Sequence, residues 1–511
     1  MKRDSEALTA EEMFALESNA EYLGISLLQL MECAGKAVAD KVAEKAKEKV
    51  CTVFAGAGRN GGDGMVASRY LASKGFKVYF YLIGVEEKIV DENVRLNWSI
   101  LKRLKNSVEI NIISDSNLIP SKVPSKIVVD AMLGIGVKGK LKPPILDAVK
   151  TLNKLNCFIV SIDTPTGLDA STGEVLGEAV KASLTVTFHK PKIGLLKAKE
   201  YTGEIYVADI GIPLEAEIYT GPGDVKKVVK PRPSSAHKGS FGRLLIIGGS
   251  KTFTGAPALA GLAALRVGVD LVYIAAPEKT ARIIASYSPN LITIKLEGEF
   301  LNPKNLDELK PYLDKATAIV VGPGLETRSE TFKTVFEILK IAEEKFLPVL
   351  LDADGVKAYS QFKDKVKGKL VLTPHRGEYK MLSNIDLTGI LEDDGKQVMD
   401  TAKKLGCTLI VKGPVDIVSD GFKVKFNWTG NPGMTVGGTG DILAGIVGGF
   451  LAQGVAPYEA AVAGIFVNGA AGDLAVNERG YHIVPTDLLD KIPTILENPR
   501  IHKDIPYGKP R

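Results

Sequence analysis

Residues 431–454 read NPGMTVGGTGDILAGIVGGFLAQG, and they carry the strongest signal in the chain. A glycine-rich turn ends in GGTGD (437–441) and opens an apolar helix. Backbone N–H groups at such a helix start form a cradle for negative charge on a transferring phosphoryl group. Asp441, at the edge of that cradle, can accept the proton of an attacking hydroxyl. The stretch predicts a phosphoryl-transfer site with Asp441 as a catalytic residue; the alternative is a helix start merely capped by an aspartate.

The segments around this turn alternate between strand-like and helix-like patterns. Near-continuous apolar runs separated by helical stretches indicate a parallel sheet that is covered on both faces. The second half is therefore predicted to be an α/β/α sandwich. Its apolar runs lie at 242–250, 270–277, 318–324, 348–355, 369–374 and 407–413, and two helices are expected at 440–453 and 457–476.

The first half shows the same alternation and predicts a second α/β/α sandwich, Rossmann-like in type. A helical region over 9–48 precedes apolar runs at 50–56, 77–84, 126–134, 157–165, 183–188 and 204–211. Residues 221–235 are rich in Pro, Gly and Lys without periodicity, which is typical of a linker. We therefore expect domains at 1–224 and 234–500, and a loose tail over 501–511.

Polar side chains gather at three predicted strand ends of the first half. The glycine-rich segment GAGRNGGDG (56–64) carries Asn60 and Asp63, while Asp130 and Asp163 follow later strands. Ligands of open parallel sheets bind at the carboxyl ends of the strands. Two unpaired carboxylates there would repel each other, and a bound cation would relieve that cost. The oxygen ligands Asn60, Asp130 and Thr166 suit a hard cation; a plain tight turn is the alternative for the glycines.

The composition limits the partners of the chain. A net charge of +5 over 511 residues is too weak to indicate nucleic acid, although it suits a small anionic ligand. The four cysteines form no CxxC pair, which is typical of a reduced, cytoplasmic protein. The N-terminus lacks the apolar core of a signal peptide, and the apolar stretch 442–452 is too short to span a membrane. We expect a cytoplasmic homo-oligomer that binds small molecules.

The motifs RNGGDG (59–64), VDAMLGIG (129–136) and SIDTPTG (161–167) resemble those of the YjeF N-terminal, NAD(P)HX epimerase family. The resemblance implies a potassium ion on Asn60, Asp130 and Thr166, with Asp163 catalytic at the reacting carbon. Arg59 and Thr166 replace the usual Asn and Ser, and Lys192 is a candidate ligand contact. The residues implied to bind the hydrated nucleotide are Arg59, Asn60, Gly61, Gly62, Asp63, Gly134, Ile135, Gly136, Val137, Lys138, Gly139, Lys140 and Asp163.

Motifs at 248–257, 321–325, 351–355, 373–382, 411–418 and 431–441 together resemble the ADP/ATP-dependent NAD(P)H-hydrate dehydratase family, which is ribokinase-like. The resemblance implies that the hydrated nucleotide lies against Ala256, Gly322, His375, Arg376, Gly377, Glu378, Tyr379, Lys380, Met381 and Asp441. For ADP or ATP, it implies Lys412, Gly413, Pro414, Val415, Asp416, Asn431, Pro432, Gly433, Met434, Thr435, Val436, Gly437, Gly438, Thr439 and Gly440. Mg²⁺ would bridge the donor phosphates.

Together the two resemblances imply an enzyme that repairs hydrated nicotinamide nucleotides. The first half would interconvert the R and S epimers, and the second would use ADP or ATP to dehydrate the S form to NADH or NADPH. Three alternatives stay open at this point. The second half resembles hydroxymethylpyrimidine or sugar kinases more distantly, with the first half as a nucleotide-binding module. The first half resembles some non-catalytic binding modules, and the whole chain could be a nucleotide sensor.

Overall fold

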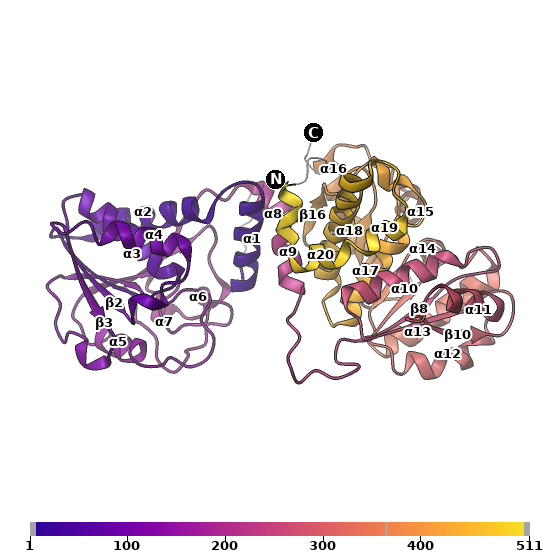
Figure 1. The fold of residues 1–511 in the computed structure, drawn as a ribbon, viewed down its shortest axis with the longest axis horizontal. Helices are drawn as coiled ribbons and strands as arrows, with labels where there is room; N and C mark the ends of the chain where they lie inside the picture. Colours follow the sequence, from indigo (N-terminus) through magenta and orange to yellow (C-terminus); the bar gives the residue numbers. More distant parts are fainter. Residues whose placement is uncertain (1–6, 363–365, 505–511) are drawn as a thin grey trace. The chain divides into compact units, whose positions relative to one another are not determined.

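The computed structural model describes residues 7–362 and 366–504. These residues form two compact units, one ending at Leu214 and the other beginning at Glu215. Each unit is a parallel-dominated sheet covered by helices on both faces, so the predicted fold class of two α/β/α sandwiches is confirmed. Figure 1 shows the helices and strands of each sandwich.

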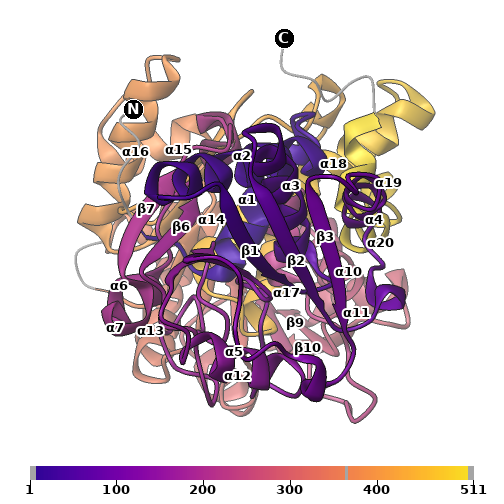
Figure 2. The same ribbon diagram turned by 90° about the vertical axis from the view of Figure 1, so that its left-hand side faces the viewer.

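The sheet of the N-terminal unit has the strand order β3-β2-β1-β4-β5-β6-β7, and every neighbouring pair is parallel. Figure 2 shows β6 and β7 on one side of β1, β2 and β3. The order reverses between β1 and β4, the point at which doubly wound sheets bind ligands. The strands are β1 (Val50–Ala55), β2 (Lys77–Ile83), β3 (Val108–Ile113), β4 (Ile127–Ala131), β5 (Phe158–Ile162), β6 (Leu184–Phe188) and β7 (Glu204–Ala208).

The helices of this unit lie on both faces of its sheet. In Figure 1, α2, α3 and α4 form one layer, and α5 covers the other face through the core around Phe54 and Val128. The predicted helical region 9–48 is two helices, because the chain turns between Tyr22 and Leu27. The helices are α1 (Ala10–Tyr22), α2 (Leu27–Lys45), α3 (Arg59–Ser73), α4 (Glu92–Leu101), α5 (Ile145–Leu152), α6 (Ile193–Lys197) and α7 (Lys199–Thr202).

The sheet of the C-terminal unit has the order β10-β9-β8-β11-β12-β13-β14-β15-β16. It is parallel as far as β14, and β15 and β16 extend it as an antiparallel edge. The strands are β8 (Arg243–Ile247), β9 (Leu271–Pro277), β10 (Ile292–Leu296), β11 (Ala318–Val321), β12 (Val349–Leu351), β13 (Leu370–Leu372), β14 (Thr408–Val411), β15 (Asp416–Ser419) and β16 (Val424–Asn427).

Helices α10, α17 and α18 pack together on one face of this sheet, and α12, α13 and α16 cover the other face. The longer helices are α10 (Gly255–Val267), α11 (Glu278–Tyr287), α12 (Asn305–Leu313), α13 (Ser329–Glu344), α16 (Leu391–Leu405), α17 (Thr439–Ala452) and α18 (Pro457–Arg479). The shorter ones are α8 (Leu214–Ile218), α9 (Pro222–Val228), α14 (Asp354–Ser360), α15 (Arg376–Ser383), α19 (Pro485–Leu489) and α20 (Ile492–Glu497).

Helix α18 is the one helix, within the described ranges, that is long and apolar enough to cross a membrane by length and composition. Its most apolar window is 89% buried inside the unit, and it packs against α9 and α17. A largely apolar helix with this burial is accounted for as a core helix of the sandwich.

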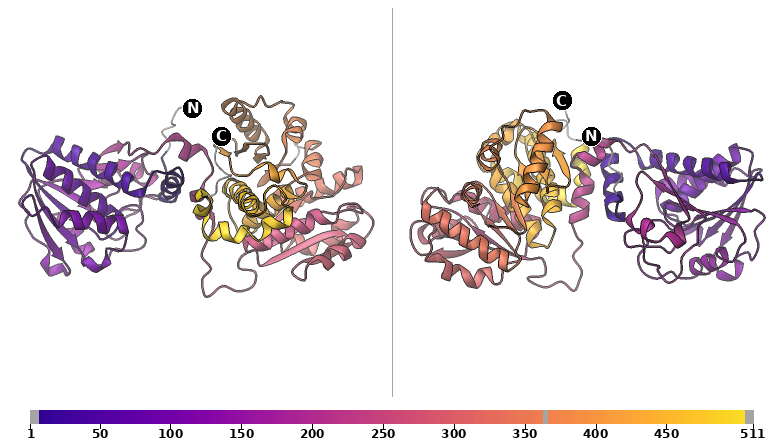
Figure 3. Two further views of the ribbon diagram at one scale, coloured as in Figure 1. Left: turned by 45° about the horizontal axis from the view of Figure 1, so that its top comes forward. Right: turned by 180° about the vertical axis from the view of Figure 1, so that it is seen from behind.

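Two segments differ from what the sequence predicted. The expected linker over 221–235 contains helix α9, while 229–242 has neither helix nor strand (Figure 3). The segment before α9 joins the C-terminal unit, because Thr220 N donates to Phe426 O at 2.9 Å and Lys425 pairs with Asp224 at 2.7 Å. In the expected loose tail, residues 501–504 complete a 3-10 helix, and 505–511 lie outside the described residues.

Candidate active sites

The first pocket lies at the carboxyl ends of the strands of the N-terminal unit. It is a cavity of about 930 Å³ whose walls come from segments 57–63, 83–91 and 132–145, with α1 and Asp163. Predicted substrate residues that line it are Arg59, Asn60, Asp63, Gly134, Ile135, Gly136, Val137, Lys138, Gly139, Lys140 and Asp163. Gly61 and Gly62 are buried in the first turn of α3 and do not line it.

Several basic side chains line this cavity, together with the acidic Glu17, Asp63, Asp91 and Asp163. Its lining includes Arg59, Lys88, Lys138, Lys140 and Lys142. Cationic walls of this kind raise the local concentration of an anionic ligand such as a nucleotide. Arg59, which replaces the usual Asn, forms an ion pair with Asp91 at 3.0 Å and extends the cationic rim.

The Asp163 carboxylate is paired, contrary to the expectation of two unpaired carboxylates. Its Oδ1 accepts from Lys192 Nζ at 2.7 Å and from Thr187 Oγ1 at 3.1 Å. The Lys192 side chain is fully buried and also donates to Thr187 and to the Phe188 carbonyl, so it holds Asp163, and it does not line the cavity. Asp163 has a φ of +60°, a strained conformation that is common at functional sites.

Sequence reasoning missed Glu17, which lines the same cavity from α1. Burial, and next the negative charge of Asp163, raise the pKa of Glu17 to about 7. The same two causes raise the pKa of Asp63 well above its usual range. A parallel bridge between Leu8 and Lys192 fixes the start of α1 beside the segment that holds Asp163. Nothing in the sequence near Glu17 signals this placement, because it depends on tertiary packing.

The predicted cation ligands lie beside this pocket. Asp130 is fully buried and accepts hydrogen bonds from Thr166 Oγ1 at 2.6 Å, Thr166 N at 2.9 Å and Ser161 Oγ at 2.9 Å. Burial raises its pKa, and these neutral donors partly oppose that shift. Asn60 Nδ2 is buried without a hydrogen-bond partner anywhere in the described part of the chain. A buried carboxylate with only neutral partners fits a small cation, to which Asn60 would contribute its amide oxygen, because its Nδ2 is a donor.

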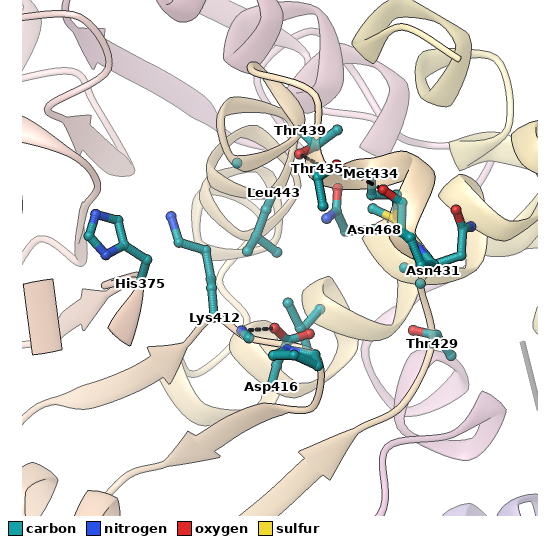
Figure 4. Close-up of a pocket in the computed structure, with 17 residues that line it drawn as sticks. His375, Lys412, Asp416, Thr429, Asn431, Met434, Thr435, Thr439, Leu443 and Asn468 are labelled. Carbon is teal, nitrogen blue, oxygen red and sulfur yellow. Dashed lines mark hydrogen bonds between the residues drawn. The ribbon is translucent and has the colours of Figure 1, made fainter. Parts of the chain in front are cut away.

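The second pocket is a cavity of about 680 Å³ in the C-terminal unit (Figure 4). Figure 4 shows Lys412 and His375 on one side and Met434, Thr435 and Asn468 on the other. Predicted residues that line it are His375, Lys412, Gly413, Pro414, Asp416, Asn431, Pro432, Met434, Thr435, Thr439 and Gly440. Val415, Gly433, Val436, Gly437 and Gly438 belong to the same loops but do not line it.

The turn before α17 has the geometry that its glycines predict. Gly438 has a φ of +109°, and a Cβ there would lie 2.7 Å from Pro485, so only glycine fits. Helix α17 then begins at Thr439, and Thr439 Oγ1 donates to the Met434 carbonyl at 2.9 Å. Lys412 Nζ lies 3.5 Å from the Cβ position of Gly440. Free N–H groups and a lysine thus meet at one helix start, an arrangement that binds phosphate.

Asp441, the predicted base, lies in the first turn of α17. Burial, and next the charge of Asp352, raise its pKa to about 7, while Lys412 acts in the opposite direction. No hydrogen bond or ion pair holds its carboxylate within 7–362 and 366–504. Asp441 and the predicted substrate residues Ala256 and Gly322 do not line the 680 Å³ cavity.

Asp352 is a second residue that sequence reasoning missed. It is buried at the end of β12, where it pairs with Lys412 at 3.0 Å and accepts from Thr373 at 2.6 Å. The motif LDADG, with an aspartate directly after an apolar strand, was the available signal. Gly322, with a φ of +132°, lets the neighbouring strand end approach: a Cβ there would lie 1.8 Å from Asp352 O.

The predicted segment 375–381 forms the start of α15. His375 Nδ1 accepts from the backbone N–H groups of Gly377 and Glu378, and Glu378 bonds back to His375 N at 3.0 Å. His375 is exposed toward the pocket, whereas the Tyr379 side chain is fully buried and bonds to Thr401. Arg376, Gly377, Lys380 and Met381 are exposed on the same helix.

Six residues line the second pocket that the sequence did not single out: Thr429, Gly430, Leu443, Ile465, Asn468 and Gly469. Asn468, on α18, is the most informative of them. It is 6% exposed, and its Oδ1 is buried without a hydrogen-bond partner among the residues described. An unsatisfied buried acceptor at a pocket wall suits a ligand with an N–H donor.

Each α/β/α sandwich contains a glycine-rich loop of the phosphate-binding type and a carboxyl group whose pKa is raised. These features define an enzyme with two sites for nucleotide-like ligands. A family model described as NAD(P)H-hydrate dehydratase matches residues 244–494, and one described as YjeF-related protein N-terminus matches 27–194. The chain belongs to the family of bifunctional NAD(P)H-hydrate repair enzymes.

Relatives align along almost the whole chain. A bifunctional NAD(P)H-hydrate repair enzyme from Hyperthermus butylicus is 43% identical over 500 residues, 96% of this chain and 93% of that protein. One from Archaeoglobus fulgidus is 42% identical over 490 residues, 96% of this chain and 98% of that protein. A crystal structure of ADP/ATP-dependent NAD(P)H-hydrate dehydratase from Bacillus subtilis is 25% identical, with a TM-score of 0.48, and covers 55% of this chain and 98% of that chain.

Proposed function

We propose that the chain returns both epimers of hydrated NADH or NADPH to the reduced nucleotide. The first pocket would interconvert the epimers, and the second would dehydrate the S form with ADP or ATP. The observation that carries this proposal is the presence, in one chain, of two separate pockets with basic side chains in their walls and a nearby carboxyl group whose pKa is raised to about 7. Glu17 lines the first pocket, and Asp441 follows Gly440, which lines the second. Family membership favours this function over a small-molecule kinase or a nucleotide sensor.

In the second pocket, Asp441 would act as the general base. The ring hydroxyl is a poor leaving group, so its oxygen attacks the terminal phosphorus of the donor while Asp441 accepts its proton. The nucleotide leaves, and the N–H groups of the 437–440 turn hold the transferring phosphoryl group. Phosphate then departs with the former hydroxyl oxygen, a neighbouring C–H proton is lost, and the ring double bond returns. A pKa of about 7 suits a base that works near neutral pH.

Lys412 lies in the pocket wall, where its ion pair with Asp352 holds it in place. From this position it would neutralise charge on the donor phosphates. The described residues offer no cluster of three or more His, Cys, Asp or Glu side chains for a metal ion. Mg²⁺ would therefore be bound mainly by the donor phosphates and would neutralise part of their charge. Asn468 would offer its free acceptor oxygen to the donor base.

In the first pocket, Asp163 would act at the reacting carbon. Lys192 and Thr187 hold its Oδ1, which leaves Oδ2 for the ligand. Epimerisation requires the stereocentre to open and close again, and a fixed carboxylate can move the proton or stabilise a cationic ring. Glu17 faces the same cavity and would exchange a proton near neutral pH. Asn60, Asp130 and Thr166 would hold K⁺, which would supply positive charge at the epimerase pocket.

Three further expectations complete the proposal. The protein works in the cytoplasm as a homo-oligomer, and its two units fold independently. The unit boundary is best tested between 214 and 215. A cut near 224–234, as the sequence predicted, leaves α8 and α9 attached to the N-terminal fragment, without the β16 residues that bind them.

The test of the function uses the full-length protein with a mixture of R- and S-hydrated NADH and either ADP or ATP. We expect free phosphate and the absorbance of the restored dihydropyridine to rise together, until both epimers are consumed. A stable phosphorylated product with no gain in absorbance would identify a kinase, and binding without turnover would identify a sensor.

A further inference from the structure

A buried polar chain supports the loop that forms one wall of the second pocket. His502 Nε2 lies 2.7 Å from Asp473 Oδ2, and both side chains are at most 2% exposed. The same Oδ2 accepts from Gly430 N at 2.8 Å, and Asp473 Oδ1 accepts from Asn431 Nδ2 at 2.7 Å. One carboxylate therefore joins the last 3-10 helix of the described chain (Pro499–Asp504) to the loop that enters the pocket.

The polar chain continues from Asn431 into the pocket wall. Asn431 Oδ1 accepts from Gly433 N at 2.9 Å and caps the 3-10 helix Pro432–Thr435. Gly430, Asn431, Pro432, Met434 and Thr435 all line the pocket, so the residues held by Asp473 lie where the phosphoryl donor is expected. Figure 4 shows Asn431 beside Met434 and Asn468 on this wall.

The loop also packs tightly on α18, the helix that carries Asp473. A Cβ at Gly469 would lie 2.2 Å from Thr429 Oγ1, and one at Gly472 would lie 2.1 Å from Met434 Sδ. The loop 429–434 therefore has little room to shift toward α18. The hydrogen bonds to Asp473 also limit its movement parallel to the axis of α18. Without the hydrogen bond from His502, the buried Asp473 carboxylate would lose one of its donors. The remaining donors from Gly430 and Asn431 would then have to shift to stabilise its charge.

We infer that His502 is a positioning residue for the phosphoryl-donor site: it orients Asp473, which fixes Gly430 and Asn431 in the conformation that binds the donor. This inference rests on the proposed function of the second pocket. The C-terminal segment, expected from sequence to be loose, would then contribute to nucleotide affinity without touching the nucleotide. The family model match ends at 494, before this segment.

The test compares His502→Phe with His502→Gln in the full-length protein. Phe keeps the ring volume against Phe466 but removes the donor to Asp473, whereas Gln keeps an N–H donor. We expect His502→Phe to raise the Kd and KM for ADP or ATP about 10-fold and to change kcat and the KM for the hydrated nucleotide less than about 2-fold. His502→Gln should restore most of the donor affinity.

Three controls separate positioning from general damage. His237→Gln changes an exposed histidine of the same unit and should leave all constants unchanged. Epimerisation by the same preparations and the thermal midpoint report on folding. Asn431→Ala, alone and with His502→Phe, completes a double-mutant cycle, in which a shared path predicts that the two losses do not add.

The inference is overturned if His502→Phe binds ADP as the wild type does, or if its loss adds fully to that of Asn431→Ala. Should His502→Phe not fold, Asp473→Asn replaces it in the same cycle with the same expected outcome. Calorimetric binding of ADP does not depend on turnover. A wild-type protein that binds ADP but never dehydrates the substrate would therefore refute the proposed function. The calorimetric binding of ADP to the variants would still decide whether His502 positions the donor site.

Discussion

The two aspartates that we propose to be catalytic occupy similar places in their sandwiches but opposite electrostatic environments. Asp163 follows a strand of the N-terminal unit and is paired with the fully buried Lys192 at 2.7 Å. Asp441 begins a helix of the C-terminal unit without a hydrogen bond or ion pair among the described residues, and its pKa is raised to about 7. A carboxylate paired with a buried lysine is held in one orientation, whereas an unpaired buried carboxyl group with a pKa near 7 can take up a proton. The difference indicates orientation for Asp163 and proton acceptance for Asp441.

The largest expected effect comes from Asp441→Asn. An amide cannot accept the hydroxyl proton, so dehydratase turnover should fall by about 10²–10⁴-fold. Donor affinity should stay the same or increase slightly, because a negative charge near the phosphates is removed. The absorbance assay with ADP or ATP measures turnover, and calorimetry measures affinity. Epimerisation, followed by separating the epimers, is the internal control; a mutant with near wild-type turnover would contradict the assignment of Asp441.

The second effect is on stability and has opposite signs at the two sites. Asp163→Asn leaves Lys192 buried without its counter-charge, and breaking a buried pair in this way costs about 3–5 kcal/mol. Asp441→Asn removes an unpaired buried carboxyl group and should raise the thermal midpoint by about 2–4 °C. Differential scanning calorimetry of the full-length protein compares the two.

A double variant keeps this comparison interpretable. Asp163→Asn combined with Lys192→Met removes both charges of the pair and should recover most of the lost stability, but not epimerisation. If Asp163→Asn alone were as stable as the wild type, the ion pair would not hold the site. If the double variant epimerised normally, Asp163 would have no catalytic role.

The sequence predicts the strands better than it predicts the residues of the sites. The central strands were predicted because buried parallel strands are near-continuous apolar runs, as in 243–247 and 318–321. The edge strands β3 and β10 and the antiparallel strands β15 and β16 were missed, because partly exposed strands carry polar residues that break the apolar run.

The sequence singled out Asp130 and Asp163 because their motifs lie at strand ends, and Asp441 because a glycine-rich turn opens its helix. Partners that come from elsewhere in the chain could not be predicted. Lys192 reaches Asp163 through a turn 29 residues later, and Glu17 comes from a helix with no motif of its own. Their placement depends on tertiary packing, which local patterns do not encode.

The third effect concerns the cation beside the epimerase pocket. Asp130→Asn removes the only charge among the proposed K⁺ ligands, so the K⁺ concentration for half-maximal epimerisation should rise roughly 10-fold or more. Ser161→Ala is the matched control, since it deletes one hydrogen bond to Asp130 and keeps the charge. Dehydration of purified S epimer should not change in either variant. Epimerisation that is equally fast with and without K⁺ in the wild type would refute the cation site.

The smallest effect is a shift in the pH profile of the dehydratase. Asp441 must be ionised to accept a proton, so log kcat/KM should fall as the pH drops below about 7. Asp352→Asn removes the neighbouring charge that raises the pKa of Asp441 and frees Lys412 to approach it. The acid limb should then move to lower pH by roughly one unit. An unchanged acid limb would show that another group controls the profile.

The most direct measurement of the central claim is complementation between two single-site variants. The Asp163→Asn/Lys192→Met protein is incubated with mixed R- and S-hydrated NADH and ADP or ATP until the absorbance stops rising, and Asp441→Asn protein is then added. We predict that the first variant stops once the S epimer is consumed, and that the addition lets the rise continue to the wild-type end point. If the first variant alone consumed both epimers at the wild-type rate, or if the addition changed nothing, the assignment of two separate activities to the two pockets would be contradicted.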